Sequence, residues 1–184
     1  GAALISSGTG KNLAKELKTV PVYVYQYYDA FRALPGDDRN ANVHVGGTNA
    51  TTPGTLGNRR IEGMWHSATT SDESFLIWQH LRKAQLVTGS ISPADAAYLP
   101  HNVAGGRVGI SSIVPIAGMT GSHFVCSGAV RGRDVKQMDI ALDDGAPDRG
   151  LVQAALQSDT TAPQTAIASA VIDDSQPYNV CMAF

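Results

Sequence analysis

The stretch from residue 13 to residue 38 constrains the fold of this chain more than any other. Its apolar residues recur at steps of three and four, which places them along one stripe of an α-helix. Directly after the stripe, Leu34-Pro35-Gly36-Asp37 supplies residues that end a helix and turn the chain. The pattern predicts an amphipathic helix that ends in a sharp turn. Its stripe consists of Leu13, Leu17, Val20, Val24, Tyr27 and Phe31.

This helix is long if residues 2–31 all belong to it, at about 45 Å for a rise of about 1.5 Å per residue. Gly8 and Gly10 weaken its first turns, and Pro21 removes one backbone hydrogen bond and predicts a kink. The β-branched and aromatic run 20–25 is an alternative strand. We favour the helix, because the spacing of three and four continues through this run.

A second helix is predicted after a loop that is rich in Gly, Asn and Thr. The loop covers residues 39–63 and includes a candidate strand at 43–45. The helix begins at a capping-box sequence, residues 70–73, and Gly89 is placed to cap its C-terminal end. Its expected buried face consists of Phe75, Trp78 and Leu81.

The remaining residues predict a sheet. Short β-like runs at 108–116, 123–130, 138–142 and 180–184 are separated by Gly, Pro and Asp-Asp-Gly turns. Residues 150–158 predict a short helix. Helices that precede a group of strands indicate the α+β class. We expect one domain, 1–184, with the first helix in 1–32, a variable loop region in 33–69, the second helix in 70–89 and the β-sheet region in 90–184.

Composition favours a folded domain whose overall charge does not attract nucleic acid or a membrane. The chain has 184 residues, of which 43% are apolar and 16% charged, enough for a real core. Its net charge of −2 gives no overall attraction to nucleic acid or anionic membranes. The five histidines show no metal-ligand spacing, and no Gly-x-Ser-x-Gly nucleophile motif is present. The sequence therefore predicts no enzyme.

The two cysteines, Cys126 and Cys181, allow two interpretations. They have neither the Cys-x-x-Cys spacing nor the nearby histidines of a zinc site. They are either two buried thiols of a cytosolic protein or one disulfide of an exported protein. We favour the disulfide, because Cys181 lies three residues from the C-terminus and a covalent link would hold a terminal strand.

Four blocks, in this order, resemble a group of Gram-negative prepilin-type proteins, the type IV pilins and type II secretion pseudopilins. The first block contains the Leu-Pro-Gly-Asp turn, and the second contains Trp78-Gln79-His80-Leu81. The third contains the run from Asp139 to Gly145, and the fourth is the cysteine pair. The first three blocks cover residues 27–38, 73–89 and 138–150.

The resemblance implies a pilin-like fold, in which the first helix packs on an antiparallel sheet. That helix would be the second half of a longer one, whose hydrophobic first half anchors the subunit in the inner membrane. The resemblance further implies a structural filament subunit of the periplasm or cell surface, with other pilins as partners and no small-molecule substrate. The six stripe residues would belong to the helix by which subunits assemble. Pilus and secretion pseudopilus, or major and minor subunit, are not distinguished.

Two groups of charged residues are candidate binding sites. Asp143, Asp144 and Asp148 could supply oxygen ligands to Ca²⁺, the one cofactor that the sequence suggests. The alternative is a polar turn in which Asp148 caps a following helix.

The second group is basic and consists of Arg131, Arg133 and Lys136. In a minor or tip pilin, these residues and the loop at 39–63 could bind a surface, a secreted protein or DNA. The alternative is an ordinary solvated face.

Overall fold

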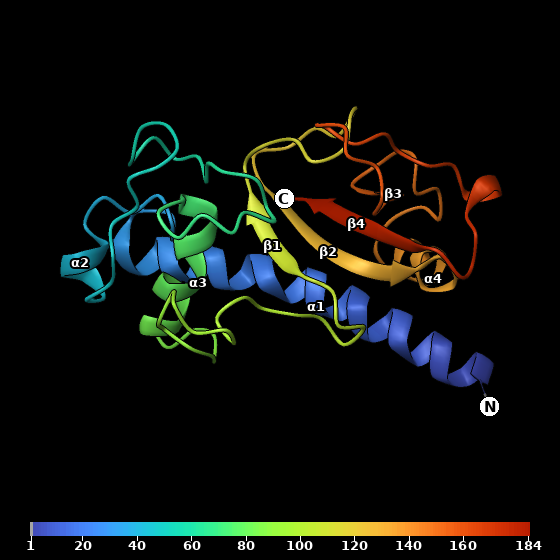
Figure 1. Cartoon of the computed structure of the whole chain (residues 1–184), viewed down its shortest axis with the longest axis horizontal. Helices are drawn as coiled ribbons and strands as arrows, with labels where there is room; N and C mark the ends of the chain where they lie inside the picture. Colours follow the sequence, from blue (N-terminus) through green and yellow to red (C-terminus); the bar gives the residue numbers. More distant parts are fainter. Residues whose placement is uncertain (1) are drawn as a thin grey trace.

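The computed structural model describes residues 2–184, with side chains from residue 9 onward. The fold is α+β, with an N-terminal helix and one antiparallel sheet, as the sequence predicts (Figure 1). The helices are α1 (Ala2–Phe31), α2 (Ala41–His44), α3 (Glu73–Lys83) and α4 (Gly132–Leu142), with a short 3-10 helix, η1 (Ser169–Val171). The strands are β1 (Val108–Ser111), β2 (Phe124–Arg131), β3 (Val152–Leu156) and β4 (Pro177–Ala183).

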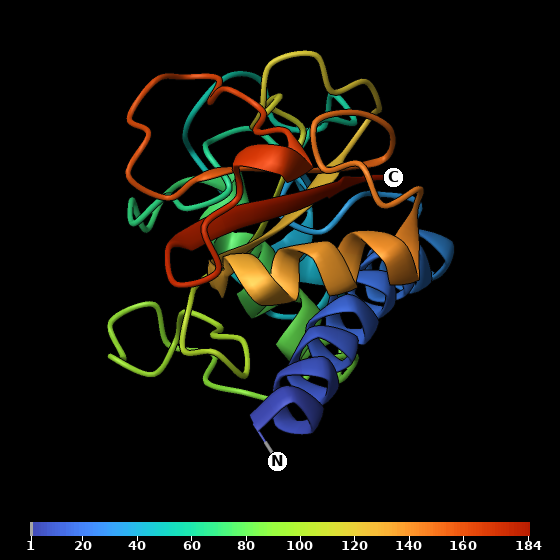
Figure 2. The same cartoon turned by 90° about the vertical axis from the view of Figure 1, so that its right-hand side faces the viewer.

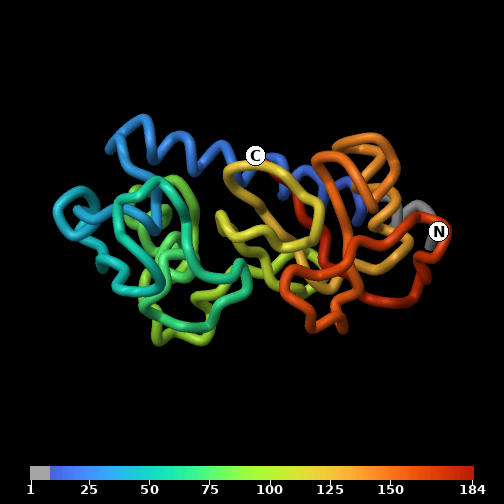
Figure 3. Tube along the Cα trace, turned by 90° about the horizontal axis from the view of Figure 1, so that it is seen from above, coloured from blue at the N-terminus to red at the C-terminus, as the bar shows by residue number. Residues whose placement is uncertain are grey.

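Helix α1 extends along the length of the molecule and contacts both of its halves. The loops around α2 and α3 lie against its C-terminal half, and the sheet and α4 lie against its N-terminal half (Figures 1 and 3). Pro21 lies inside α1 without ending it, which excludes the alternative strand at 20–25. Among the described residues, no helix is long and apolar enough to cross a bilayer.

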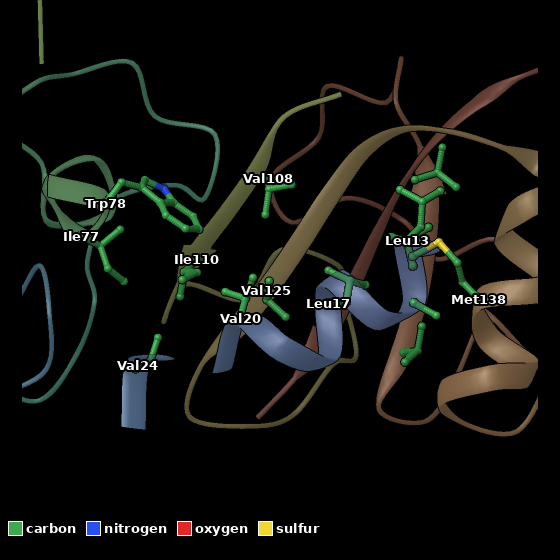
Figure 4. Packing of buried hydrophobic residues seen from close by; sticks show 14 of the residues in the cluster. Leu13, Leu17, Val20, Val24, Ile77, Trp78, Val108, Ile110, Val125 and Met138 are labelled. Atoms are coloured by element: carbon green, nitrogen blue, oxygen red, sulfur yellow. The ribbon is translucent and has the colours of Figure 1, made fainter. Parts of the chain in front are cut away.

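The inner stripe of α1 forms the centre of the main core. Leu13, Leu17 and Val24 are almost fully buried, and they meet β-strand residues such as Val125 and the α4 residue Met138 (Figure 4). Gly10 belongs to the same contact, because a Cβ atom there would lie 2.8 Å from Cβ of Gln137. This glycine, which weakens the helix by propensity, therefore allows α1 and α4 to approach closely.

The strand order is β1-β2-β4-β3, and every neighbouring pair is antiparallel. The C-terminal strand β4 lies inside the sheet and is hydrogen-bonded on both edges. The expectation that this strand needs a covalent link because little else holds it is therefore wrong.

The two faces of the sheet have different covers. Val125 and Val180 face the main core, where α1 and α4 cover the sheet. Phe124 and Cys126 face the opposite side, where they pack with residues of the long loops such as Ile116. Figure 2 shows both helices on one side of β4 and loops on the other.

Three local predictions of secondary structure are wrong. Residues 43–45 are not a strand, since one helical turn, α2, covers 41–44. Residues 138–142 belong to α4, where Val135 and Met138 bury one helical face against α1. Residues 150–158 contain β3 instead of a helix, because its residues 152–155 are buried on both faces. Burial on both faces removes the alternation by which a strand is recognised.

The predicted second helix is present as α3, and Phe75, Trp78 and Leu81 are buried as expected. The predicted capping box at 70–73 is wrong, because the helix begins at Glu73 and its N-cap, Asp72, makes no side-chain cap bond.

At the other end of α3 the C-cap is Ala84, and Gln85 after it takes the place predicted for Gly89. Gln85 has a left-handed φ of 63°. Its N–H donates to the carbonyl of Arg82, and the Leu86 N–H donates to the carbonyl of Leu81. These two bonds form a Schellman motif.

Candidate functional site

The stripe predicted to serve assembly faces inward. Five of its residues are buried in the chain's own core, and Phe31 packs against that core from its edge. The stripe thus holds the sheet and α3. A contact between subunits through α1 would have to use its opposite face. The buried five are Leu13, Leu17, Val20, Val24 and Tyr27.

That opposite face forms a second stripe, which we call the outer stripe. Its residues also recur at steps of three and four, and all of them are exposed. The N-terminal part is basic, the middle is apolar, and the C-terminal end is acidic. Val22 and Tyr25, in the middle, each expose 49% of their surface. The outer stripe consists of Lys11, Lys15, Lys18, Val22, Tyr25 and Asp29.

The Leu-Pro-Gly-Asp turn connects α1 to α3. Gly36 has a φ of +83°, and its N–H donates to Nδ1 of His80 at 2.8 Å. His80 is fully buried, and its Nε2 lies 2.7 Å from the carbonyl oxygen of Thr48. Nε2 must therefore be the protonated nitrogen, and the ring is neutral. Burial lowers the pKa of His80 and agrees with this state.

The carboxylate of Asp38 makes three further polar contacts in the same turn. Its Oδ2 accepts from the Tyr27 hydroxyl at 2.7 Å and lies 2.7 Å from Nδ1 of His44. Its Oδ1 accepts from the Asn40 N–H at 2.9 Å. Burial and the neighbouring Asp38 raise the pKa of Tyr27, so the phenol stays protonated as a donor. This carboxylate therefore ties α1 to α2.

Asp37 and Glu73 form a buried pair of carboxyl groups. Asp37 accepts from the N–H groups of Gly57 at 2.8 Å, Asn58 at 3.3 Å and Arg59 at 2.7 Å. Its side chain also hydrogen-bonds that of Glu73. Burial raises the pKa of both groups, and burial together with Asp37 raises that of Glu73 to about 9. At neutral pH Glu73 is then the protonated donor and Asp37 the ionised acceptor.

We expect Glu73→Gln to remove a pH dependence of stability. Because the pKa of Glu73 is raised in the folded protein, its contribution is fully present near pH 4 and falls as the pH rises toward about 9. Gln keeps an acceptor for the Glu62 N–H and a donor for Asp37 at every pH. Urea unfolding from pH 5 to pH 9 should show a variant within about 1 kcal/mol of wild type at pH 5. At pH 9 the variant should be the more stable protein.

Asp29→Asn is the control for this experiment, since Asp29 is exposed on α1 away from the turn. It should keep the wild-type dependence on pH. If the profiles of Glu73→Gln and wild type run parallel from pH 5 to pH 9, then Glu73 does not carry the shared proton.

The polar groups around the turn are joined to one another and to backbone atoms. They fix the end of α1 against α3 and the loop at 57–59. This arrangement is structural, since it holds the described parts of the chain together and presents no nucleophile with an adjacent base.

Two members of the predicted basic group, Arg131 and Lys136, have partners in the turn that contains Asp174 and Ser175. Arg131 donates from Nη1 to the carbonyl of Ser175 at 2.7 Å, and Nζ of Lys136 lies 3.9 Å from Oδ1 of Asp174. Arg133 is exposed on the first turn of α4. The structure brings the three residues near the start of α4, with part of their charge offset by Asp174.

The acidic candidate differs from its prediction by one residue. Asp143 and Asp144 come together with Asp139, and one oxygen of each lies within 4.8 Å of the others. Asp148 is not in this group, and no helix follows it to be capped, since the next element is β3. Asp139 lies four residues before Asp143, one helical turn away. That spacing is the signal that could have identified it.

A cavity of about 720 Å³ opens beside the sheet. Trp65, Arg107 and Asn179 line it, together with the loop at 157–164. The guanidinium of Arg107 donates to the carbonyl groups of His66 and Ser67, at 2.9 Å each. Sequence reasoning missed this cavity, because its walls come from distant parts of the chain.

Cys126 and Cys181 form a disulfide. They are directly opposite one another on β2 and β4, and both are fully buried on the loop-covered face of the sheet. The predicted pairing of the two cysteines is therefore confirmed. Comparison of the chain with known proteins finds no matching protein-family model, no matching characterised protein and no matching solved structure.

Proposed function

We propose that this chain is the globular head of a filament subunit of the type IV pilus or type II secretion pseudopilus class. The observation that carries the proposal is that α1 has two stripes on opposite faces, one buried in the core and one exposed. One stripe of this 30-residue helix holds the head together, while the outer stripe is exposed and only its Tyr25 ring contacts another described ring, that of Phe184. A helix with two long stripes, one internal and one open, is suited to packing against copies of itself.

The charges on the outer stripe support a staggered, parallel array. Lysines occupy its N-terminal part and Asp29 its C-terminal end, so a neighbour shifted along the axis brings opposite charges together. Contacts of this head-to-tail kind do not close and generate helical filaments.

The position of the N-terminal end of α1 fits a membrane-anchored subunit. That end lies at one end of the molecule, beyond the sheet (Figure 1). A preceding hydrophobic segment would extend the helix outward into the inner membrane. The disulfide is suited to an oxidising compartment, the periplasm or cell surface of a Gram-negative bacterium.

A binding subunit of the same class, a minor or tip pilin, is the second candidate. The cavity beside Arg107 favours it, because it is large enough for a small ligand or a peptide end. Such a subunit would keep the same head and act by recognition rather than turnover. The pairing of Lys136 with Asp174 and of Arg131 with Ser175 makes DNA the weaker choice of partner.

Cysteine crosslinking of the outer stripe tests the filament proposal. The chain's two cysteines are paired, so one added cysteine is a unique thiol. We expect Val22→Cys, in the full-length subunit expressed with its assembly machinery, to yield covalent dimers after treatment of sheared filaments with a bismaleimide, because each subunit offers one thiol.

Val103→Cys is the matched control, because Val103 is 61% exposed but lies in a loop far along the chain from α1. It should react with a monofunctional maleimide equally well and yield few covalent dimers. Absence of filaments containing this subunit would refute the proposed function. Filaments that crosslink through Val103 and not through Val22 would refute the role of the outer stripe.

A further inference from the structure

Asp139 is a buried carboxylic acid without a positively charged partner among the described residues. Its side chain is fully buried in the last turn of α4, and neither carboxyl oxygen has a hydrogen bond of normal geometry within that part of the chain, although the Gly145 N–H interacts with it. Burying a charged group without a partner is costly, so such groups are paired, protonated or bound to a metal ion. Asp139 therefore needs an explanation that the fold alone does not supply.

Two further carboxylates are directed toward it. One oxygen each from Asp139, Asp143 and Asp144 lies within 4.8 Å of the others. Asp143 is held by a bond from the Val152 N–H at 3.1 Å, and Asp144 by one from the Ala146 N–H at 2.9 Å. Each carboxylate has further lone pairs for a ligand. The backbone thus positions two acidic groups beside a buried third.

The local electrostatics lack a compensating positive charge. The C-terminal end of a helix carries partial negative charge and favours cations, yet the last turn of α4 contains no basic residue. Nε of Arg149 lies 3.7 Å from Oδ2 of Asp144, but this arginine is mostly exposed, and such pairs contribute little. Burial and three neighbouring aspartates raise the pKa of Asp139 to about 7, and the Gly145 amide offsets this only in part.

We propose that Asp139, Asp143 and Asp144 bind one Ca²⁺ ion at the C-terminal end of α4. Hard cations take carboxylate oxygens, and Ca²⁺ binds them at about 2.4 Å in irregular loops. Oxygens that lie within 4.8 Å of one another can therefore reach the same Ca²⁺. Mg²⁺ needs oxygens at about 2.1 Å in strict octahedral geometry, which three carboxylates around an irregular turn supply less readily. Backbone carbonyls and water would complete the shell.

Bound Ca²⁺ would connect three elements. Asp139 belongs to α4, Asp143 and Asp144 lie in the turn after it, and Asp143 is already bonded to the start of β3. The ion would fix the turn between α4 and β3 and so the edge of the sheet. The proposal rests on this geometry and does not depend on the filament proposal.

Calcium binding to the isolated head domain is the test. Protein stripped with EDTA is titrated with CaCl₂ by calorimetry, and its melting temperature is measured with CaCl₂ or MgCl₂ at equal ionic strength. We expect one site per chain and a rise in melting temperature of several degrees in millimolar CaCl₂, with a smaller rise in MgCl₂.

Asp139→Asn is the decisive variant, because it replaces the buried charge by a neutral group of the same shape. It should bind Ca²⁺ at least tenfold more weakly and melt no lower than metal-free wild type. Asp148→Asn removes an exposed charge that acts on Asp139 from outside the cluster, and it should weaken Ca²⁺ binding much less than Asp139→Asn does.

Three results would overturn the proposal. One is the absence of heat and of any shift in wild type, which would leave Asp139 as a protonated buried acid. The second is an equal Ca²⁺ response of Asp139→Asn and wild type. The third is an equal loss of binding in Asp148→Asn and Asp139→Asn, which would indicate diffuse attraction to a negative surface.

Discussion

Replacement of both Cys126 and Cys181 by alanine is expected to lower the free energy of unfolding by about 4 kcal/mol. The bond closes a segment of 55 residues and so restricts the unfolded chain. In the chain-entropy account, a loop of this length contributes about 4 kcal/mol. The substitutions affect the folded state less than the unfolded state, because the backbone hydrogen bonds between β2 and β4 remain and β3 still flanks β4. Urea unfolding should show a lower midpoint and a steeper slope, since the unlinked chain exposes more surface.

Ile116→Val is the control for lost packing in the same cluster. It removes one methylene group, and should cost about 1 kcal/mol without a change in slope. A thiol titration of denatured wild type should find no thiol before reduction and two after it. Equal unfolding midpoints for oxidised wild type and the double variant would show that the bond does not stabilise the fold.

The sequence predicts α1 well, because its inner stripe keeps one helical period for five turns. It does not predict which partner the stripe meets. The resemblance to pilins assigned Leu13 and Val24 to the helix by which subunits would assemble, and in the structure both side chains are buried in the core of the chain itself. The spacing of apolar residues along a helix indicates that one face is apolar, but it does not indicate which part of a protein covers that face.

The errors in the second half have one cause. Strand β3 is buried on both faces, so its sequence lacks alternation, and α4 has only a short apolar face. In both segments the local pattern of apolar residues is weak, and long-range packing determines whether a helix or a strand forms. Strands β1, β2 and β4 were located approximately, since turn residues separate them in the sequence.

The candidate sites depend on contacts that no local pattern contains. The turn at Gly36 was recognisable from Pro35 and Gly36, but its partners Glu73 and His80 come from another helix. The acidic cluster was located by composition with one wrong member. Its buried member, Asp139, becomes evident only when burial is known.

Gly36→Ala is expected to destabilise the protein by at least about 3 kcal/mol. Two costs combine at this position. The backbone has a φ of +83°, which costs a residue with a side chain about 1 kcal/mol. The added Cβ atom would lie 2.4 Å from the carbonyl oxygen of Glu73 and 3.2 Å from Cβ of Ile77. Because Glu73 and Ile77 both belong to α3, the turn and the helix must separate to relieve the clash.

Gly105→Ala distinguishes these two costs. Gly105 has almost the same φ, +84°, but nothing lies within 4 Å of the position that its Cβ would occupy. This variant should lose only the conformational part, about 1 kcal/mol, in the same urea experiment. Separation of the turn from α3 would also break the bond from the Gly36 N–H to His80, and would leave a buried ring nitrogen without its donor. Equal losses for the two variants would mean that α3 moves away at little cost and that the turn does not fix α1 against it.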